Sequence, residues 1–168
     1  SDYDLRRPLT PSGTNLLGIV KHVASVEIGY FTEVFGRPCP VSLPWFDEDA
    51  EPNADFLVTV DESREFIIDL YHQSWQASDA TINDLDLEHP GIVPWWGETS
   101  QHVTLQQIMV HMTTETHRHA GHADIVRELI DGARGYRAGA LNLPGFAAEE
   151  WRTFYEKVSF SAQQFRTD

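Results

Sequence analysis

The segment from Thr104 to Asp131 constrains the fold of this chain more than any other part of the sequence. It begins with "TLQQ", in which Thr104 and Gln107 form the capping-box pattern that starts many helices. Gly132 follows directly and is a natural left-handed stop. We therefore expect one helix over this range, the longest of the chain, with other helices packed against it.

Three further segments show helical periodicity, at residues 15–36, 61–85 and 146–165. In the first, apolar residues recur at three- and four-residue steps: Leu16, Ile19, Val20, Val23, Tyr30, Phe31 and Val34. Ser12 or Thr14 can cap its start, and Gly36 is a natural stop before Pro38. This segment is thus expected to present one apolar side to the rest of the bundle.

The second segment has an apolar stripe of Phe66, Leu70 and Trp75, with Ile67 and Tyr71 beside it. The sequence has no internal repeat, no convincing alternating strand and no linker long enough to divide it. We therefore predict an all-α protein, a four-helix bundle that forms a single domain over residues 1–168.

Net charge and cysteine content narrow the classes of partner and compartment. The net charge of −14 disfavours nucleic acid and anionic membranes as partners. No apolar run approaches the roughly 20 residues that span a bilayer. Cys39 is the only cysteine, so an intramolecular disulfide is impossible and a reducing cytoplasm is expected. The acidic run in residues 37–55 indicates solvated surface, and Cys39 is interpreted as an incidental loop thiol.

A polar stripe on the long helix carries the strongest chemical signal. At about 100° per residue, His111, Glu115, His119 and His122 fall in one arc narrower than a quarter turn. His117 falls about 240° away from His111, on another face. The stripe continues through the apolar residues Ile108, Val126 and Leu129, so it lies on or beside the packing face.

Buried imidazoles and carboxylates cost free energy unless their lone pairs are satisfied, and a divalent cation would satisfy them. Glu115 and His119 are one helical turn apart and supply two ligands, so a third must come from another element. His22, between Val20 and Val23 on the first helix, is the candidate. The alternative is a histidine-rich packing face, in which a core histidine is hydrogen-bonded and holds no metal.

Two stretches, "NLLGIVKHVASVEIGYF" and "VTLQQIMVHMTTETHRHAGHADIVRELIDG", resemble the DinB/YfiT-like superfamily. The resemblance is closest to an actinobacterial branch of unknown function that includes the mini-circle-type proteins. It extends from about Leu16 to Trp151 and includes "VPWWG". It implies a DinB-like four-helix bundle that binds a divalent metal, Zn²⁺ or Ni²⁺. Relatives usually begin with an additional helix, whereas only a short stretch precedes "LTPSGTNLLG" here.

The resemblance also implies a ligand set of His22, Glu115 and His119. The common family pattern has histidine where this sequence has Glu115, but the related mycothiol-dependent maleylpyruvate isomerases use a His, Glu, His set. His122 and His111 remain alternative ligands. Family members often form dimers, so a homodimer is the default expectation.

Three protein ligands leave an open metal position, which is typical of catalytic sites. By resemblance, the expected activity is S-transfer from a small thiol such as mycothiol to an electrophile, with the thiolate on the metal. A hydrolase with a metal-bound water and a non-catalytic metal-binding or stress-response module are the alternatives. Arg118 could pair with a substrate carboxylate, and Trp95 and Trp96 could wall the pocket. Surface salt bridging and loop packing are the competing interpretations of these three residues.

Overall fold

The structure of the protein is a computed structural model that describes residues 1–134, 137 and 140–167. Its contacts divide the chain into two compact units, Ser1–Ala133 and Arg134–Asp168, which are described separately. Among the described residues, no helix is long and apolar enough to cross a membrane. The prediction of one domain over the whole chain is not tested by this division.

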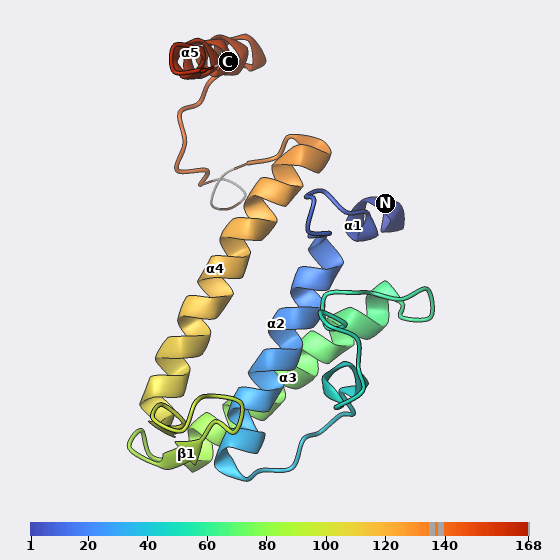
Figure 1. Cartoon of the computed structure of the whole chain (residues 1–168), viewed down its shortest axis with the longest axis vertical. Coiled ribbons are helices and arrows are strands. Elements are labelled where there is room, and N and C mark those ends of the chain that lie inside the picture. Colours follow the sequence, from blue (N-terminus) through green and yellow to red (C-terminus); the bar gives the residue numbers. More distant parts are fainter. Residues whose placement is uncertain (135–136, 138–139, 168) are drawn as a thin grey trace. The chain divides into compact units, whose positions relative to one another are not determined.

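The first unit contains most of the secondary structure (Figure 1). Its elements, in chain order, are α1 (Asp2–Arg6), α2 (Leu16–Phe31), the 3-10 turns η1 (Glu33–Phe35) and η2 (Pro44–Phe46), α3 (Arg64–Asp84), β1 (Pro90–Ile92), β2 (His102–Thr104) and α4 (Leu105–Asp131). Helix α2 packs against both α3 and α4. The all-α prediction is therefore confirmed, with one small strand pair added.

The start of α2 differs from the prediction. Its cap is Asn15, whose side chain accepts a hydrogen bond from the backbone N–H of Gly18. The hydroxyls of Ser12 and Thr14 instead belong to the preceding turn, where Ser12 contacts Thr10. Helix α4 behaves as predicted, with a capping box at Thr104 and a left-handed Gly132 at its end.

Helix α3 also buries a different face from the one predicted. Phe66 and Trp75 are exposed by 39% and 47%, so the predicted apolar stripe is wrong at both positions. The buried side is formed by Ile67, Leu70, Ser74, Ser78 and Thr81. Small hydroxyl residues bring α3 close to α2, as in the hydrogen bond from the Thr81 hydroxyl to the Phe31 carbonyl at 2.6 Å. Hydrophobicity alone does not reveal such a face.

The antiparallel pair β1–β2 was not expected, and its register places Gly91 opposite Val103. Each strand has only three residues, too few for a clear alternation of apolar and polar positions. The pair packs against the end of η1, because a Cβ atom at Gly91 would lie 2.7 Å from the Phe35 ring. The strands thus close one end of the α2–α4 interface.

The second unit contains α5 (Ala148–Gln163), close to the predicted residues 146–165. Within this unit, Trp151 lies 5.1 Å from the ring of Phe146, centre to centre. The Arg134 guanidinium lies 4.5 Å from the centre of the Trp151 ring. The place of α5 as the fourth helix of a bundle stays a prediction.

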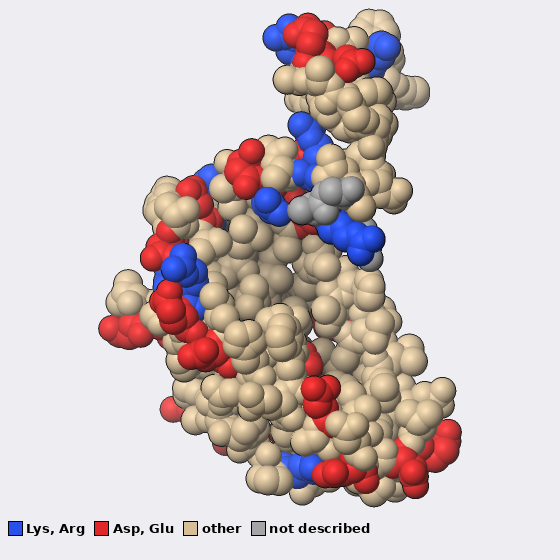
Figure 2. All heavy atoms as spheres, turned by 180° about the vertical axis from the view of Figure 1, so that it is seen from behind, with Lys and Arg blue, Asp and Glu red and all other residues tan. Residues whose placement is uncertain are grey.

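The surface of the protein is strongly acidic, since Asp and Glu number 26 against 12 Lys and Arg. Figure 2 shows acidic side chains spread over one face of the first unit, with basic side chains in small groups among them. Glu27 of α2 is a partly buried carboxylate that accepts hydrogen bonds from the hydroxyls of Ser74 and Ser78. Burial raises the pKa of Glu27 above its ordinary value of 4.5, although both serines oppose the shift and Asp79 adds to it.

We expect Glu27→Gln to stabilise the protein at neutral pH. A raised carboxyl pKa contributes stability that is fully present below pH 4.5 and is lost as the pH rises through the pKa of the folded state. Glutamine carries no charge; it keeps one oxygen acceptor and replaces the other carboxylate oxygen by an NH₂ group, which can donate to a serine hydroxyl oxygen. Thermal unfolding should show a higher Tm for the variant at pH 7.5, with a difference that narrows toward pH 4. A difference that does not depend on pH between these limits would contradict this assignment.

Candidate metal centre

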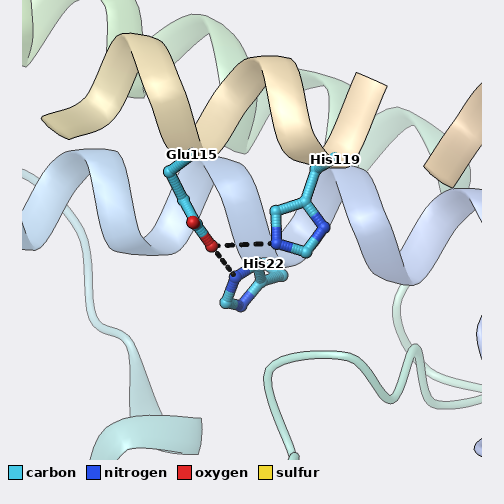
Figure 3. A group of neighbouring side chains, drawn as sticks. All are labelled: His22, Glu115 and His119. Carbon is cyan, nitrogen blue, oxygen red and sulfur yellow. Dashed lines mark hydrogen bonds and ion pairs between the residues drawn. The ribbon is translucent and has the colours of Figure 1, made fainter. Parts of the chain in front are cut away.

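Three side chains from two helices converge between α2 and α4 (Figure 3). His22 projects from α2, and Glu115 and His119 project from α4. Each offers one ligand atom, and these atoms lie within 4.8 Å of one another. The Glu115 Oε1 atom is 2.9 Å from His119 Nε2 and 3.7 Å from His22 Nε2. The structure therefore brings together the three residues that the sequence analysis predicted as ligands.

Helix geometry explains this arrangement. Glu115 and His119 are four residues apart and so lie on the same face of α4, which also carries the buried Met112 and Val126. His119 is 5% exposed, whereas Glu115 and His22 are partly buried. The three residues thus lie at the edge of the core, where a cation would be partly shielded from bulk water.

The distances suit a divalent cation. Two tetrahedral ligand atoms, each about 2.0–2.1 Å from a zinc ion, lie about 3.4 Å apart. The two separations that involve Glu115, 2.9 Å and 3.7 Å, bracket this value, and all three ligand atoms lie within 4.8 Å of one another. Two imidazoles and one carboxylate are also a donor set that zinc and nickel accept. The residues present therefore fit the metal that the family resemblance implies.

The charge states also suit a cation. Burial lowers the pKa of His119, with a further contribution from the nearby His22 ring. Burial alone would raise the pKa of Glu115, but the hydrogen bond with His119, the His119 charge and the Arg118 charge bring it below its ordinary value. Both shifts favour a neutral imidazole beside an ionised carboxylate, the forms that ligate metals.

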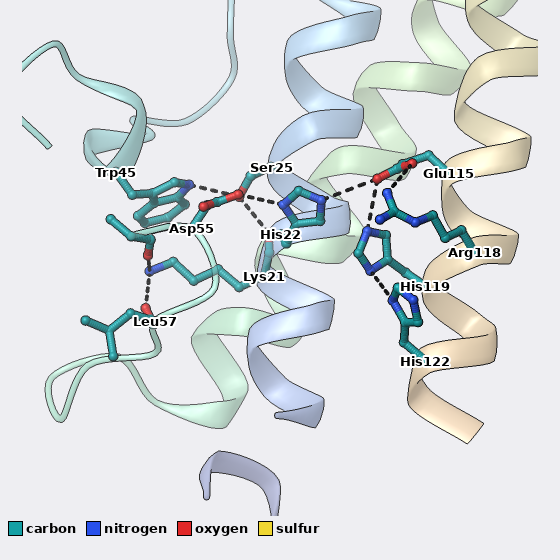
Figure 4. Close-up of polar contacts among 11 residues, drawn as sticks. Lys21, His22, Ser25, Trp45, Asp55, Leu57, Glu115, Arg118, His119 and His122 are labelled. Carbon is teal, nitrogen blue, oxygen red and sulfur yellow. Dashed lines mark hydrogen bonds and ion pairs between the residues drawn. The ribbon is translucent and has the colours of Figure 1, made fainter. Parts of the chain in front are cut away.

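His22 is oriented by two residues that the sequence analysis did not select, Asp55 and Phe56 (Figure 4 shows Asp55). The Asp55 Oδ2 atom lies 2.5 Å from His22 Nδ1. An ionised carboxylate accepts a hydrogen bond from Nδ1–H, and Nε2 is the ring nitrogen that faces Glu115. The Phe56 ring stacks on His22 with centroids 4.1 Å apart. Such a carboxylate–histidine pair is typical of metal ligands.

The two alternative ligands lie elsewhere around the site. His122 is exposed, and its Nδ1 atom is 3.4 Å from the Nδ1 atom of His119, on the ring edge away from Glu115. His111 contacts aromatic rings instead, with centroids 4.8 Å from Tyr30 and 5.0 Å from Trp96. Among the described residues, the group that could hold a metal contains neither of them.

The three predicted substrate-binding residues have different surroundings. Arg118 is exposed, and its nearest described contact is a 3.7 Å ion pair with Glu115. Trp95 and Trp96 both donate their indole N–H to the Tyr30 hydroxyl, at 3.3 and 3.0 Å. Trp96 packs against the apolar core, whereas Trp95 lines a pocket.

The pocket that Trp95 lines has a volume of about 730 Å³ and includes His22 and Asp55 in its wall. Its other lining residues include Tyr30, Glu33, Cys39 and Asp47. Among the described lining residues there are three carboxylates and no Lys or Arg. Cys39 is exposed, and its thiol donates to the Val41 carbonyl at 2.9 Å, which agrees with its interpretation as a loop thiol.

Comparison with known proteins supports the resemblance that the two motifs suggested. A search of the curated proteins gave no match. A family model described as Mycothiol-S-transferase matches residues 1–132, which include α2, α4 and all three candidate ligands. The match covers well over half of the 168 residues. The chain therefore belongs to the mycothiol-S-transferase family, a DinB-like family.

Proposed function

We propose that this protein is a divalent-metal-dependent thiol S-transferase that uses mycothiol, with His22, Glu115 and His119 as the metal ligands. The observation that carries the proposal is the convergence of these three ligand atoms within 4.8 Å of one another. One of the three residues, His22, also lines the 730 Å³ pocket. Membership of the mycothiol-S-transferase family supports the choice of thiol.

A divalent cation in this position supplies a positive charge that lowers the pKa of a thiol and keeps it as a nucleophilic thiolate at neutral pH. The protein's own residues prepare the site for that chemistry. His22 and His119 offer imidazole nitrogen donors, and Glu115 contributes a carboxylate oxygen. Asp55 is placed to accept a hydrogen bond from His22 Nδ1, which leaves Nε2 as the nitrogen that can bind the metal.

The pocket beside His22 would hold the rest of the thiol or the electrophile. Its described wall contains Glu33, Asp47 and Asp55 but no basic side chain. Carboxylates in a partly enclosed pocket repel anions, accept hydrogen bonds from hydroxyl groups and attract ammonium groups. Neutral hydroxylated or cationic substrates therefore fit this wall better than carboxylates do.

The proposal is tested by measuring metal content and thiol-dependent activity on the same protein preparation. Untagged protein equilibrated with Zn²⁺ or Ni²⁺ should contain about one ion per chain by plasma mass spectrometry, as one closed set of three ligands requires. With mycothiol and monochlorobimane, the loaded protein should accelerate formation of the fluorescent thioether. In that step the thiolate sulfur forms a C–S bond, the C–Cl bond breaks, chloride leaves and the thiol proton passes to solvent.

The controls separate the alternatives. Metal-free protein and loaded protein without thiol should both be inactive with the electrophile. Ester hydrolysis by the loaded protein without thiol would instead indicate a metal-dependent hydrolase. A chain that stays metal-free after equilibration with both ions would overturn the metalloenzyme proposal.

A further inference from the structure

A lysine is buried inside α2, directly beside the candidate ligand His22. Lys21 is 2% exposed, and an unpaired charge at such a position would cost several kcal/mol. Its Nζ atom has three polar partners among the described residues, two backbone carbonyls and one carboxylate. It donates to the carbonyls of Leu57 at 2.7 Å and Ala54 at 3.2 Å, and it lies 2.8 Å from the Glu62 carboxylate (Figure 4 shows Leu57).

All three of these partners belong to residues 54–62, the anchor loop. The same loop supplies Asp55, which accepts from His22 Nδ1, and Phe56, which stacks on the His22 ring. Lys21 and His22 are consecutive, so their side chains leave α2 about 100° apart. The anchor loop therefore wraps around α2, and Lys21 holds it on one side while it contacts His22 on the other.

Further contacts hold the anchor loop against α2 and α1. A Cβ atom at Gly18 would overlap the Phe56 carbonyl oxygen, so the loop backbone lies directly against the helix there. Arg6 donates to the carbonyls of Thr59 and Glu62, at 3.1 and 2.6 Å. These contacts begin at Phe56, directly after Asp55, and continue to Glu62, so they hold the part of the loop that lies beside His22.

The Lys21 ammonium also has an aromatic partner outside the anchor loop. It lies 4.1 Å from the centre of the Trp45 ring, within the range of a cation–π interaction. The Trp45 indole N–H donates to the Ser25 hydroxyl at 3.0 Å, and that hydroxyl donates to the Lys21 carbonyl at 2.6 Å. An apolar side chain could fill the volume of Lys21 but could not bind two carbonyls and a carboxylate of the loop.

We propose that Lys21 is a positioning residue for the metal centre: it fixes the anchor loop so that Asp55 and Phe56 hold the His22 ring with Nε2 directed at Glu115 and His119. The metal-related part of this inference rests on the proposed function. The part that concerns the His22 ring holds in the metal-free protein as well, and it can be measured there.

The test compares wild type with Lys21→Met, which keeps an unbranched side chain of similar length and removes the ammonium group. In metal-free protein, long-range ¹H–¹⁵N NMR should show the His22 proton fixed on Nδ1 in the wild type and distributed over both ring nitrogens in the variant. The affinity for Ni²⁺, measured by competition with a chelator, should fall about 10-fold or more, the usual effect of losing an outer-shell partner.

A matched control removes stability without touching the anchor loop. Thr81→Val deletes a buried hydroxyl whose hydrogen bond is to Phe31, and it should lower Tm while leaving the His22 spectrum and the Ni²⁺ affinity unchanged. If Lys21→Met does not fold, Glu62→Gln serves in its place, because it removes the counter-charge of Lys21 and its carboxylate acceptor while the amide oxygen still accepts from Thr59 N–H. It should shift both readouts in the same direction.

Two outcomes separate the inference from the proposed function. A Lys21→Met protein that folds, keeps the His22 proton on Nδ1 and binds Ni²⁺ within twofold of wild type would overturn the positioning assignment. A wild-type chain that binds no metal overturns the proposed function, and the ring-nitrogen spectra of the metal-free proteins then decide on Lys21 alone.

Discussion

His119→Ala is expected to abolish stoichiometric metal binding and, with it, thiol-dependent turnover. His119 is the most buried of the three candidate ligands, and its Nε2 atom lies 2.9 Å from Glu115 Oε1. Without it, only two of the three candidate ligands remain, His22 on α2 and Glu115 on α4. We expect metal affinity to fall by more than about 100-fold, the upper end of the effect of outer-shell partners. Chelator competition and plasma mass spectrometry measure the loss directly.

His117→Ala is the matched control for this prediction. His117 lies two residues away on the same helix, is exposed, and has its Nδ1 atom 2.7 Å from the Thr113 carbonyl. It should retain about one ion per chain and the activity of the wild type. Because His119 is buried, its variant must also be shown to be folded by circular dichroism. A folded His119→Ala protein that keeps one ion per chain would contradict the ligand assignment, and loss of the ion in His122→Ala would point to His122 instead.

The geometry of the candidate site was predictable where it depends on helical periodicity. Glu115 and His119 share a face of α4 because they are four residues apart, and a strong cap at Thr104 together with Gly132 fixes the limits of that helix. His22 was found as a polar residue in an apolar stripe. That both helices bring these residues together follows from packing, which the family resemblance suggested and the spacing alone did not.

The face that α3 buries could not be predicted from its hydrophobic residues. Ser74, Ser78 and Thr81 are buried because their hydroxyls find acceptors on α2 or on α3 itself. Phe66 and Trp75 are left partly exposed as a result. A pattern that counts only apolar residues predicts that Phe66 and Trp75 are buried and that the hydroxyl residues are exposed. It cannot include the hydrogen bonds that buried hydroxyls form with a neighbouring helix.

The surroundings of His22 were missed for a different reason. Asp55 follows a run of acidic residues, Asp47, Glu48, Asp49 and Glu51, which are exposed as predicted. Asp55 is the exception: its side chain is 13% exposed because it pairs with His22, 33 positions earlier in the chain. The sequence does not indicate that Lys21 is buried, because a lysine among apolar residues normally extends to solvent. Only the position of the anchor loop shows that both residues are buried and paired.

Asp55→Asn is expected to weaken metal binding by about 10- to 100-fold, equivalent to about 1.4–2.7 kcal/mol, without unfolding the protein. Asparagine has nearly the same shape and its Oδ1 atom still accepts from His22 Nδ1, but the negative charge is lost. The bond to Nδ1–H becomes weaker, and the amide can also present its NH₂ group, which favours the other ring tautomer. His22 Nε2 then becomes a poorer donor. Competition titrations with Zn²⁺ and Ni²⁺ measure the change in affinity.

The control for this prediction is Asp49→Asn, which removes the same charge from an exposed position in the preceding loop. Both variants change the net charge equally, so a general electrostatic effect on cation binding would weaken them alike. We expect only Asp55→Asn to lose affinity and to lose the fixed Nδ1 proton of His22 in the metal-free protein. Equal affinities in the two variants would mean that the 2.5 Å contact between Asp55 and His22 has no part in holding the metal.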